Sequence, residues 1–414
     1  MKSIVKKKKI EIPYGGAMAW NDDGELVDPN DLGTDGWPKM KKLVTASAPG
    51  KILWLGGYSV LEKGNASFVC AVDKRVKATL KHSKGKIVLS SPQYSFEVAC
   101  SFDKQKGKLI LEQPVPAARF VAKAVEVALC YLSAKKVAIE NFSLSTFGDS
   151  EFGVGGGKSG LGSSAAATVA CVAGVLAFHG IAPRGKNEIL VHNLSQISHS
   201  LAQGKVGSGF DIAAACFGSC EYSRYSPQLI SNLGESPIPK QIAELVDSKW
   251  DYSIEKIALP PSLRIVLANV VASSASTTEM VKKVSEWKKN SPNDYALIVK
   301  SLNDSNKEAI AALKKGELEK FKDNFESGWQ LTVELGCASG AQICPPLLGE
   351  LLAESSRHGA FVAKLPGAGG GDSVAAICLS EKEEKQLKSF WKSYKQVKLG
   401  ILPVQASATG VVLE

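Results

Sequence analysis

The sequence is poor in the residues that build metal and redox centres. It has 5 histidines at scattered positions, and its 9 cysteines include no Cys-x-x-Cys pair. A structural zinc site needs several Cys or His ligands at close spacing, so none is expected. The odd number of cysteines and the lack of an apolar secretory segment near Met1 predict reduced, mostly buried thiols in a cytoplasmic protein.

Aromatic residues and long uncharged runs are also scarce. Aromatics make up 7% of the chain, and 50 basic residues are mixed with 41 acidic ones for a formal net charge of +9. A nucleic-acid surface would cluster basic and aromatic residues, so the composition favours a small anionic substrate instead. The uncharged run at residues 159–178 is rich in Gly, Ser and Ala, and it predicts a loop and a buried helix rather than a membrane span. Nothing in the sequence fixes an oligomeric state.

The most informative stretch is the glycine-rich segment 153–167, which leads into an apolar, alanine-rich run. Glycine lets a backbone approach an oxyanion closely, and the following helix N-terminus favours negative charge, so we expect phosphate here. A Walker A loop would need glycine at position 152, which is Phe152. A dinucleotide fingerprint would need an acidic residue about 20 positions further on. That span holds none, since Glu188 is the next acidic residue after Glu151.

Hydrophobic periodicity predicts an α+β chain. Residues 1–42 read as a mobile extension without a function. Two short strands are expected at 43–46 and 52–55, with a tight turn at 48–51 that holds Lys51. Further along, the patterns predict these elements: strands at 69–72, 74–80, 263–271, 359–364 and 374–379, helices at 187–203 and 302–313, and a capping box at 276–279.

Asp211 stands out because it follows a second glycine cluster, residues 204–209, and precedes an apolar segment. A carboxylate in that position is either a helix N-cap or a catalytic group. Lys205 and the neighbouring glycines favour a role at an anionic site, and the residues alone leave both readings open.

Three motifs in this order resemble those of the GHMP small-molecule kinases. They are Ala48-Pro49-Gly50-Lys51, Lys158-Ser159-Gly160-Leu161-Gly162-Ser163-Ser164-Ala165 and Leu365-Pro366-Gly367-Ala368-Gly369-Gly370-Gly371-Asp372. Within this superfamily, Gly56-Gly57-Tyr58 and the segment 203–211 look most like phosphomevalonate kinases of the eukaryotic type. Mevalonate kinases and galactokinases carry Gly-Glu-His where this chain has Gly56-Gly57-Tyr58.

The resemblance implies a two-domain α+β fold. It comprises an extension at 1–42, an ATP-binding catalytic domain at 43–258 like ribosomal protein S5 domain 2, and a ferredoxin-like domain at 259–414. The implied reaction is ATP-dependent phosphorylation of 5-phosphomevalonate in isoprenoid biosynthesis, with Mg²⁺. Two alternatives stay open: another acceptor, such as mevalonate, mevalonate 3-phosphate or a sugar, and a non-catalytic paralogue that binds ATP.

The resemblance also implies roles for individual residues. Lys51 would pair with Asp211 and neutralise developing charge, and Asp211 would accept or orient the proton of the attacking oxygen. Ser163 or Ser164 would hold Mg²⁺ through its hydroxyl. The ATP site would comprise Gly155, Gly156, Gly157, Lys158, Ser159, Gly160, Leu161, Gly162, Ser163, Ser164 and Ala165. The acceptor site would comprise Tyr58, Lys205, Ser208, Ser274, Ser276, Gly369 and Gly370, with Lys74 and Arg75 as further candidates for binding its phosphate.

In one respect the chain departs from this pattern. Several relatives supply a glutamate to Mg²⁺ from the helix before the catalytic aspartate, whereas residues 198–203 contain no carboxylate. The metal would then rely on a serine and on the phosphates of ATP.

Overall fold

The computed structural model describes residues 10–11, 17–20, 26–27, 43–153, 160–271 and 277–414. They belong to two compact units, residues 1–43 and 44–414. In the first unit the described strands are antiparallel neighbours: β1 (Ile10–Glu11), β2 (Ala17–Trp20) and β3 (Leu26–Val27).

A large sheet organises the first part of the second unit, in the strand order β11-β10-β5-β9-β6-β7-β8. Strands β6 and β9 run parallel. The strands of this path are β5 (Ala66–His82), β6 (Ile87–Ser91), β7 (Phe96–Asp103), β8 (Lys108–Leu111), β9 (Phe142–Gly148), β10 (Cys220–Ser223) and β11 (Ser253–Lys256), and β4 (Leu43–Leu55) pairs with β5.

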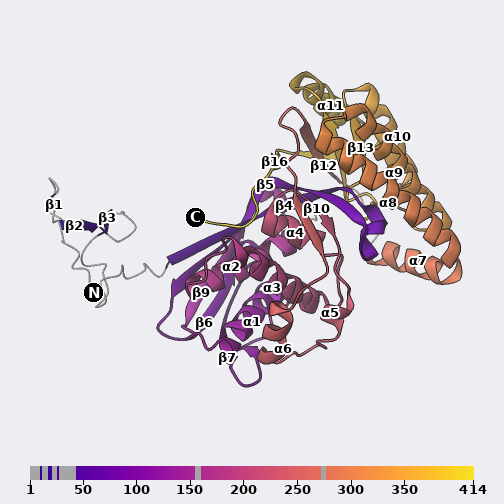
Figure 1. The fold of residues 1–414 in the computed structure, drawn as a ribbon. Coiled ribbons are helices and arrows are strands. Elements are labelled where there is room, and N and C mark those ends of the chain that lie inside the picture. Colours follow the sequence, from indigo (N-terminus) through magenta and orange to yellow (C-terminus); the bar gives the residue numbers. More distant parts are fainter. Residues whose placement is uncertain (1–9, 12–16, 21–25, 28–42, 154–159, 272–276) are drawn as a thin grey trace, which may run out of the picture. The chain divides into compact units, whose positions relative to one another are not determined.

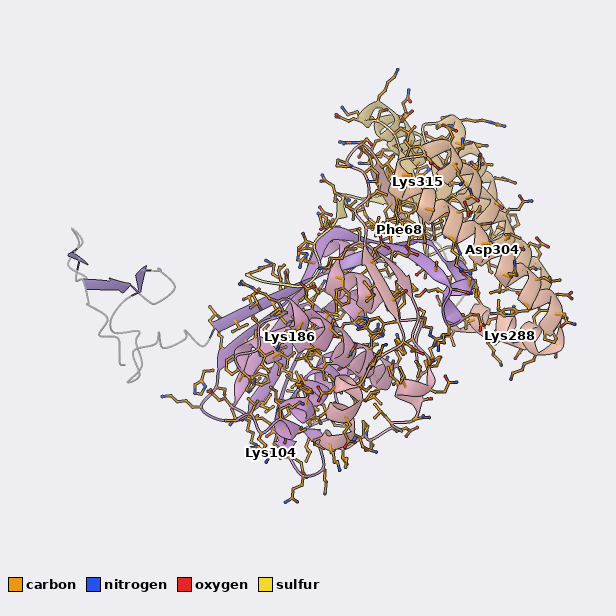
Figure 2. The ribbon with its side chains drawn as sticks, viewed as in Figure 1. Phe68, Lys104, Lys186, Lys288, Asp304 and Lys315 are labelled. Carbon is orange, nitrogen blue, oxygen red and sulfur yellow. The ribbon has the colours of Figure 1, made fainter. Side chains whose placement is uncertain are left out.

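Helices pack against this sheet, and α2 (Ser163–Phe178) contacts β5 and β9 directly (Figure 1). Gly174 makes this close approach possible, because a Cβ there would lie 2.6 Å from Leu80 Cδ1. The neighbouring helices are α1 (Arg119–Ala134), α3 (Lys186–Gln203), α4 (Phe210–Phe217), α5 (Gln228–Ser231) and α6 (Pro239–Asp247), with short 3₁₀ turns η2 (Gly57–Leu61), η3 (Pro92–Tyr94), η4 (Pro116–Ala118) and η5 (Ser150–Phe152). Phe68 on β5 is fully buried, whereas Lys104 and Lys186 are exposed (Figure 2).

A smaller four-stranded antiparallel sheet follows, in the order β13-β14-β12-β15. Its strands are β12 (Arg264–Val270), β13 (Val362–Lys364), β14 (Ser373–Cys378) and β15 (Leu399–Leu402), and its helices are α7 (Thr277–Asn290), α8 (Pro292–Lys315), α9 (Leu318–Ser339), α10 (Pro346–Arg357) and α11 (Glu381–Ser393). The chain order is strand, helices, two strands, helix, strand, which is the ferredoxin-like arrangement. The ferredoxin-like part of the expected fold is confirmed.

The segment 48–51 is not a turn, contrary to the sequence-based expectation. It lies within one continuous strand, β4, of 13 residues. Its small residues serve packing: a Cβ at Gly50 would lie 3.1 Å from the Leu161 carbonyl oxygen and from the Phe152 ring. Glycine is needed here because the neighbouring loop comes close to the strand.

The end of the chain returns to the large sheet. Strand β16 (Ala406–Ser407) pairs with β5, and β17 (Val412–Leu413) pairs with β4. The Arg75 guanidinium donates hydrogen bonds to Ser47 and to the Gly410 carbonyl, 2.7 Å away. The tail is thus held on the sheet that also carries Lys51.

Candidate active site

Lys51 forms two hydrogen bonds with the described end of the glycine-rich loop, one from its backbone and one from its side chain. Its backbone N–H donates to the Leu161 carbonyl at 2.9 Å, and its Nζ donates to the Gly160 carbonyl at 2.7 Å. Gly162 lies alongside with φ of 77°, and a Cβ there would be 3.0 Å from Lys51 Cε. The loop and the lysine therefore occupy fixed positions relative to each other.

Asp211 acts on the same lysine through its charge. Burial lowers the pKa of Lys51, and the negative charge of Asp211 opposes this shift. Asp211 is in the first turn of α4, where its Oδ1 accepts the Ile212 N–H at 3.0 Å. The N-cap of α4 is Gly209, so Asp211 is not the cap. No ion pair joins Lys51 to Asp211 among the described residues, because the half-buried Lys51 ammonium bonds to the Gly160 carbonyl instead. In the field of Asp211 this ammonium can still stabilise a developing anion.

The serine pair opens α2, and Gly162 is its N-cap. The first backbone N–H groups of a helix have no intrahelical acceptor and favour an anion. Ser164 Oγ lies 3.1 Å from Nε2 of His199, a residue of α3 that is buried. Burial lowers the pKa of His199, which favours a neutral ring. No local pattern indicates this contact, because the two residues are 35 positions apart.

A pocket of about 290 Å³ adjoins the serine pair. Ser163 and Ser164 form part of its wall, and most of its exposed lining is apolar. The aromatic residues around it include Tyr94, Phe120 and Phe147, and Arg119 lies over the Phe120 ring at 5.0 Å. We did not predict this pocket. The residue that could have indicated the pocket is Phe147, an aromatic side chain at an outward-facing position of β9 that is 58% exposed.

Buried side chains donate hydrogen bonds to backbone carbonyls of the second glycine cluster. The Tyr222 hydroxyl donates to the Ser208 carbonyl at 3.2 Å. Arg224 is buried and donates to the Leu61 and Val206 carbonyls. Lys205, in contrast, is exposed and can move toward an anionic ligand.

Two other basic candidates are engaged elsewhere. Lys74 lies 3.5 Å from Asp73 and 3.2 Å from Glu151, and Arg75 holds the C-terminal tail. Both side chains therefore have intramolecular partners in this arrangement.

The third glycine turn, residues 365–373, reaches the glycine-rich loop. A Cβ at Gly160 would lie 2.9 Å from Ser373 Oγ. Within the turn, the Gly370 N–H donates to the Ile343 carbonyl at 2.8 Å, and the Gly369 N–H lies 3.4 Å from the Pro366 carbonyl. Both amides already have intramolecular partners.

Tyr58, a residue of η2, contacts this turn. Its hydroxyl donates to the Ala368 carbonyl at 3.2 Å, and the side chain is 2% exposed. Burial raises the pKa of Tyr58 to about 12, so the hydroxyl remains protonated at neutral pH.

Some predicted site residues lie outside the described residues. These are Gly155, Gly156, Gly157, Lys158, Ser159, Ser274 and Ser276. The described residues bring together Lys51, Asp211, Ser163, Ser164 and the third turn. Across these same residues, no group of three His, Cys, Asp or Glu side chains forms a metal site.

Two family models match this chain. The GHMP kinases N terminal domain matches residues 121–219, and the GHMP kinases C terminal domain matches residues 309–396. The phosphomevalonate kinase of Saccharolobus solfataricus is 30% identical, over 81% of this chain and 90% of that protein. The chain belongs to the GHMP kinase family.

Two further proteins similar to this GHMP kinase are named phosphomevalonate kinase. The phosphomevalonate kinase of Gibberella zeae is 29% identical over 89% of this chain and 96% of that protein. Among solved structures, the Streptococcus pneumoniae phosphomevalonate kinase in complex with phosphomevalonate and AMPPNP matches with a TM-score of 0.72. That match has 22% identity and covers 88% of this chain and 99% of the other. It confirms the two-domain α+β fold expected from the motifs. No helix within the described part of this kinase is long and apolar enough to cross a membrane.

Proposed function

We propose that this GHMP kinase transfers the γ-phosphoryl group of ATP to the phosphate of 5-phosphomevalonate, giving 5-diphosphomevalonate and ADP. The proposal is carried by relatives named phosphomevalonate kinase, at 29–30% identity over more than four fifths of the chain. The site supports it, because a half-buried lysine lies in the field of a carboxylate and against Gly162, the N-cap of α2.

In the proposed reaction an oxygen of the acceptor phosphate attacks the γ-phosphorus of ATP. A new P–O bond forms, the bond to the β–γ bridging oxygen breaks, and its electron pair leaves with ADP. The acceptor phosphate is already ionised near pH 7, so a general base contributes little. We therefore assign the main role to Lys51, which stabilises the transferring phosphoryl group, and an orienting role to Asp211.

We propose that the nucleotide lies across the start of α2. Its phosphates would bind the N-terminal amides, the Ser163 and Ser164 hydroxyls and the glycine-rich loop. The apolar pocket of about 290 Å³ next to the serines suits the adenine ring, with Phe147 and Tyr94 beside it. Lys205, Ser208 and the segment that includes Ser274 and Ser276 remain the proposed acceptor site, together with the turn that contains Gly369 and Gly370.

Mg²⁺ is part of the proposal. The cation prefers oxygen ligands in octahedral geometry and keeps several waters or substrate phosphates. The site fits this preference, because the neutral His199 ring can accept a hydrogen bond from the Ser164 hydroxyl and leave the oxygen lone pairs to face a cation. When bound, Mg²⁺ would neutralise charge on the phosphate oxygens.

We keep the domain division at 42/43 and 258/259 as a proposal, with the tail returning to the large sheet.

We also propose that the enzyme works in the cytoplasm. Its nine cysteines are all free thiols, which suits a reducing compartment.

The test is ADP release with Mg-ATP and a panel of acceptors: 5-phosphomevalonate, mevalonate, mevalonate 3-phosphate, homoserine and galactose. We expect selective turnover of 5-phosphomevalonate. Turnover of mevalonate alone would replace the acceptor and keep the kinase. Tight ATP binding without turnover of any acceptor would overturn the enzymatic assignment.

A further inference from the structure

Lys364 is a buried lysine that the proposed reaction does not use. It ends β13, is 5% exposed, and donates from Nζ to the Trp54 carbonyl at 3.0 Å. Its ammonium lies 5.6 Å from the centroid of the Trp329 ring. Among the carboxylates that the structure describes, none forms an ion pair with it; burial alone lowers its pKa to about 8.

A buried ammonium without a carboxylate is unfavourable for folding. Its desolvation costs more free energy than its contacts with one carbonyl and one aromatic ring restore. A methionine of similar length would fill the same space without that cost. Residues that break a packing rule in this way are concentrated at functional sites. The surroundings of Lys364 show what it holds in place.

Lys364 directly precedes the third glycine turn, residues 365–373. Its acceptor, the Trp54 carbonyl, belongs to β4, which also carries Lys51. The middle of the turn has a second attachment, the hydrogen bond from the Tyr58 hydroxyl to the Ala368 carbonyl. Both attachments therefore connect the small sheet and its turn to residues 54–58.

The other end of the turn reaches the reaction site. Ser373 lies against Gly160, where there is no space for a Cβ, and the Gly160 carbonyl accepts from Lys51 Nζ at 2.7 Å. A shift of the turn would move Ser373 against Gly160, and the Lys51 ammonium would lose its alignment.

A small cavity lies beside Lys364. Its volume is about 10 Å³, and Lys364, Asn306 and Thr332 are part of its wall. Asn306 Oδ1 accepts the Gly56 N–H at 3.1 Å, and its Nδ2 donates to Ser59 Oγ at 3.2 Å. The residues around Tyr58 are thus fixed by α8 while Lys364 fixes the turn.

We propose that Lys364 is a positioning residue: with Tyr58 it clamps the third glycine turn to β4 and η2, and so sets the alignment of Gly160 and Lys51 for phosphoryl transfer. This inference rests on the proposed phosphotransfer at this site. It does not depend on which acceptor is used.

The test compares Lys364→Met and Tyr58→Phe with two matched controls. Lys314→Met removes a lysine of α8 that forms ion pairs with Glu221 and Glu255 on the large sheet. Neither of these partners belongs to the third glycine turn. Tyr295→Phe removes another buried hydroxyl of the apolar cluster that contains Tyr58. The readouts are Tm, kcat and KM with the acceptor that the wild type uses, and AMPPNP affinity by calorimetry.

We expect Lys364→Met to lower kcat at least ~10-fold, since small displacements of reacting groups are costly to rate. Its Tm should equal or exceed that of the wild type, because the buried charge is gone. Tyr58→Phe should lower kcat several-fold, and the double variant should lose less than the product of the two effects. Lys314→Met should keep kcat within ~2-fold, the range of independent sites. Tyr295→Phe, whose hydroxyl bonds Glu62 at the end of η2 and not the turn, should lower kcat less than Tyr58→Phe.

Full kcat in Lys364→Met would overturn the proposal. A lowered Tm, together with a loss of AMPPNP affinity as large as the loss of kcat, would also overturn it, since Lys364 would then be a purely structural residue. If Lys364→Met does not fold, Lys364→Gln keeps a donor toward Trp54 without the charge, and its kcat should stay above that of Tyr58→Phe. A wild type that prefers another acceptor would change the proposed function and leave this comparison intact.

Discussion

Replacing Lys51 with methionine is the most direct test of the site. Methionine keeps most of the aliphatic length and removes the ammonium that donates to the Gly160 carbonyl at 2.7 Å. The ammonium is half-buried and lies in the field of Asp211, so solvent screens its charge only in part. The substitution therefore removes a partly desolvated electrostatic contact.

The expected loss can be set from comparable sites. Removing one preorganised donor from a developing anion costs about 2.7–4 kcal/mol, or a factor of ~10²–10³ in kcat. Because the Gly160 carbonyl also loses its donor, we expect Lys51→Met to lie toward the upper end. Tm should not fall, since a desolvated charge is replaced by an apolar group of similar shape.

The assay is coupled ADP release under saturating substrates, with AMPPNP affinity measured in parallel. Lys256→Met is the matched control, because its Nζ lies 5.9 Å from the Phe217 ring much as Lys51 Nζ lies 5.6 Å from the Phe210 ring. We expect the control to keep its kcat. Near-normal kcat in Lys51→Met would refute the assignment of Lys51 as the transition-state cation.

Three further predictions follow from the same geometry. Gly162→Ala should lower Tm and reduce kcat about 10-fold, because alanine at φ of 77° costs ~1–2 kcal/mol and its Cβ would press on Lys51 Cε; unchanged kcat would contradict the close contact. Phe147→Ala should raise KM for ATP roughly 10-fold at constant Tm, since stacking of a base on an aromatic ring is worth about 1–3 kcal/mol; an unchanged KM would place the adenine elsewhere. For Lys364 the folded pKa of about 8 lies below the unfolded value, so the wild type should gain stability relative to Lys364→Met as pH rises from 8 to 10. A difference in unfolding free energy that stays constant with pH would show that this lysine is not desolvated.

Local residue chemistry was sufficient to predict much of this protein. Three glycine-rich motifs, Lys51, Asp211 and the serine pair stand out in the sequence because phosphate binding needs bare backbone, fixed charge and hydroxyls at short spacing. The ferredoxin-like order was expected only from the resemblance of these motifs to those of the GHMP kinases. The helix predicted at 187–203 corresponds to α3 (Lys186–Gln203).

Contacts between distant parts of the chain could not be predicted this way. The sequence suggested a turn at 48–51, but β4 runs straight through it, since Gly50 accommodates the Leu161 carbonyl from another segment. Only the tertiary structure brings His199 to Ser164, and the lining residues of the apolar pocket into one cavity. The bond from Lys364 to Trp54 joins residues 310 positions apart. The sequence alone determined which chemical groups the protein has, because residue types and short spacings suffice for that. Tertiary folding decided which of them meet, because burial and hydrogen bonding of remote segments depend on packing that no local pattern encodes.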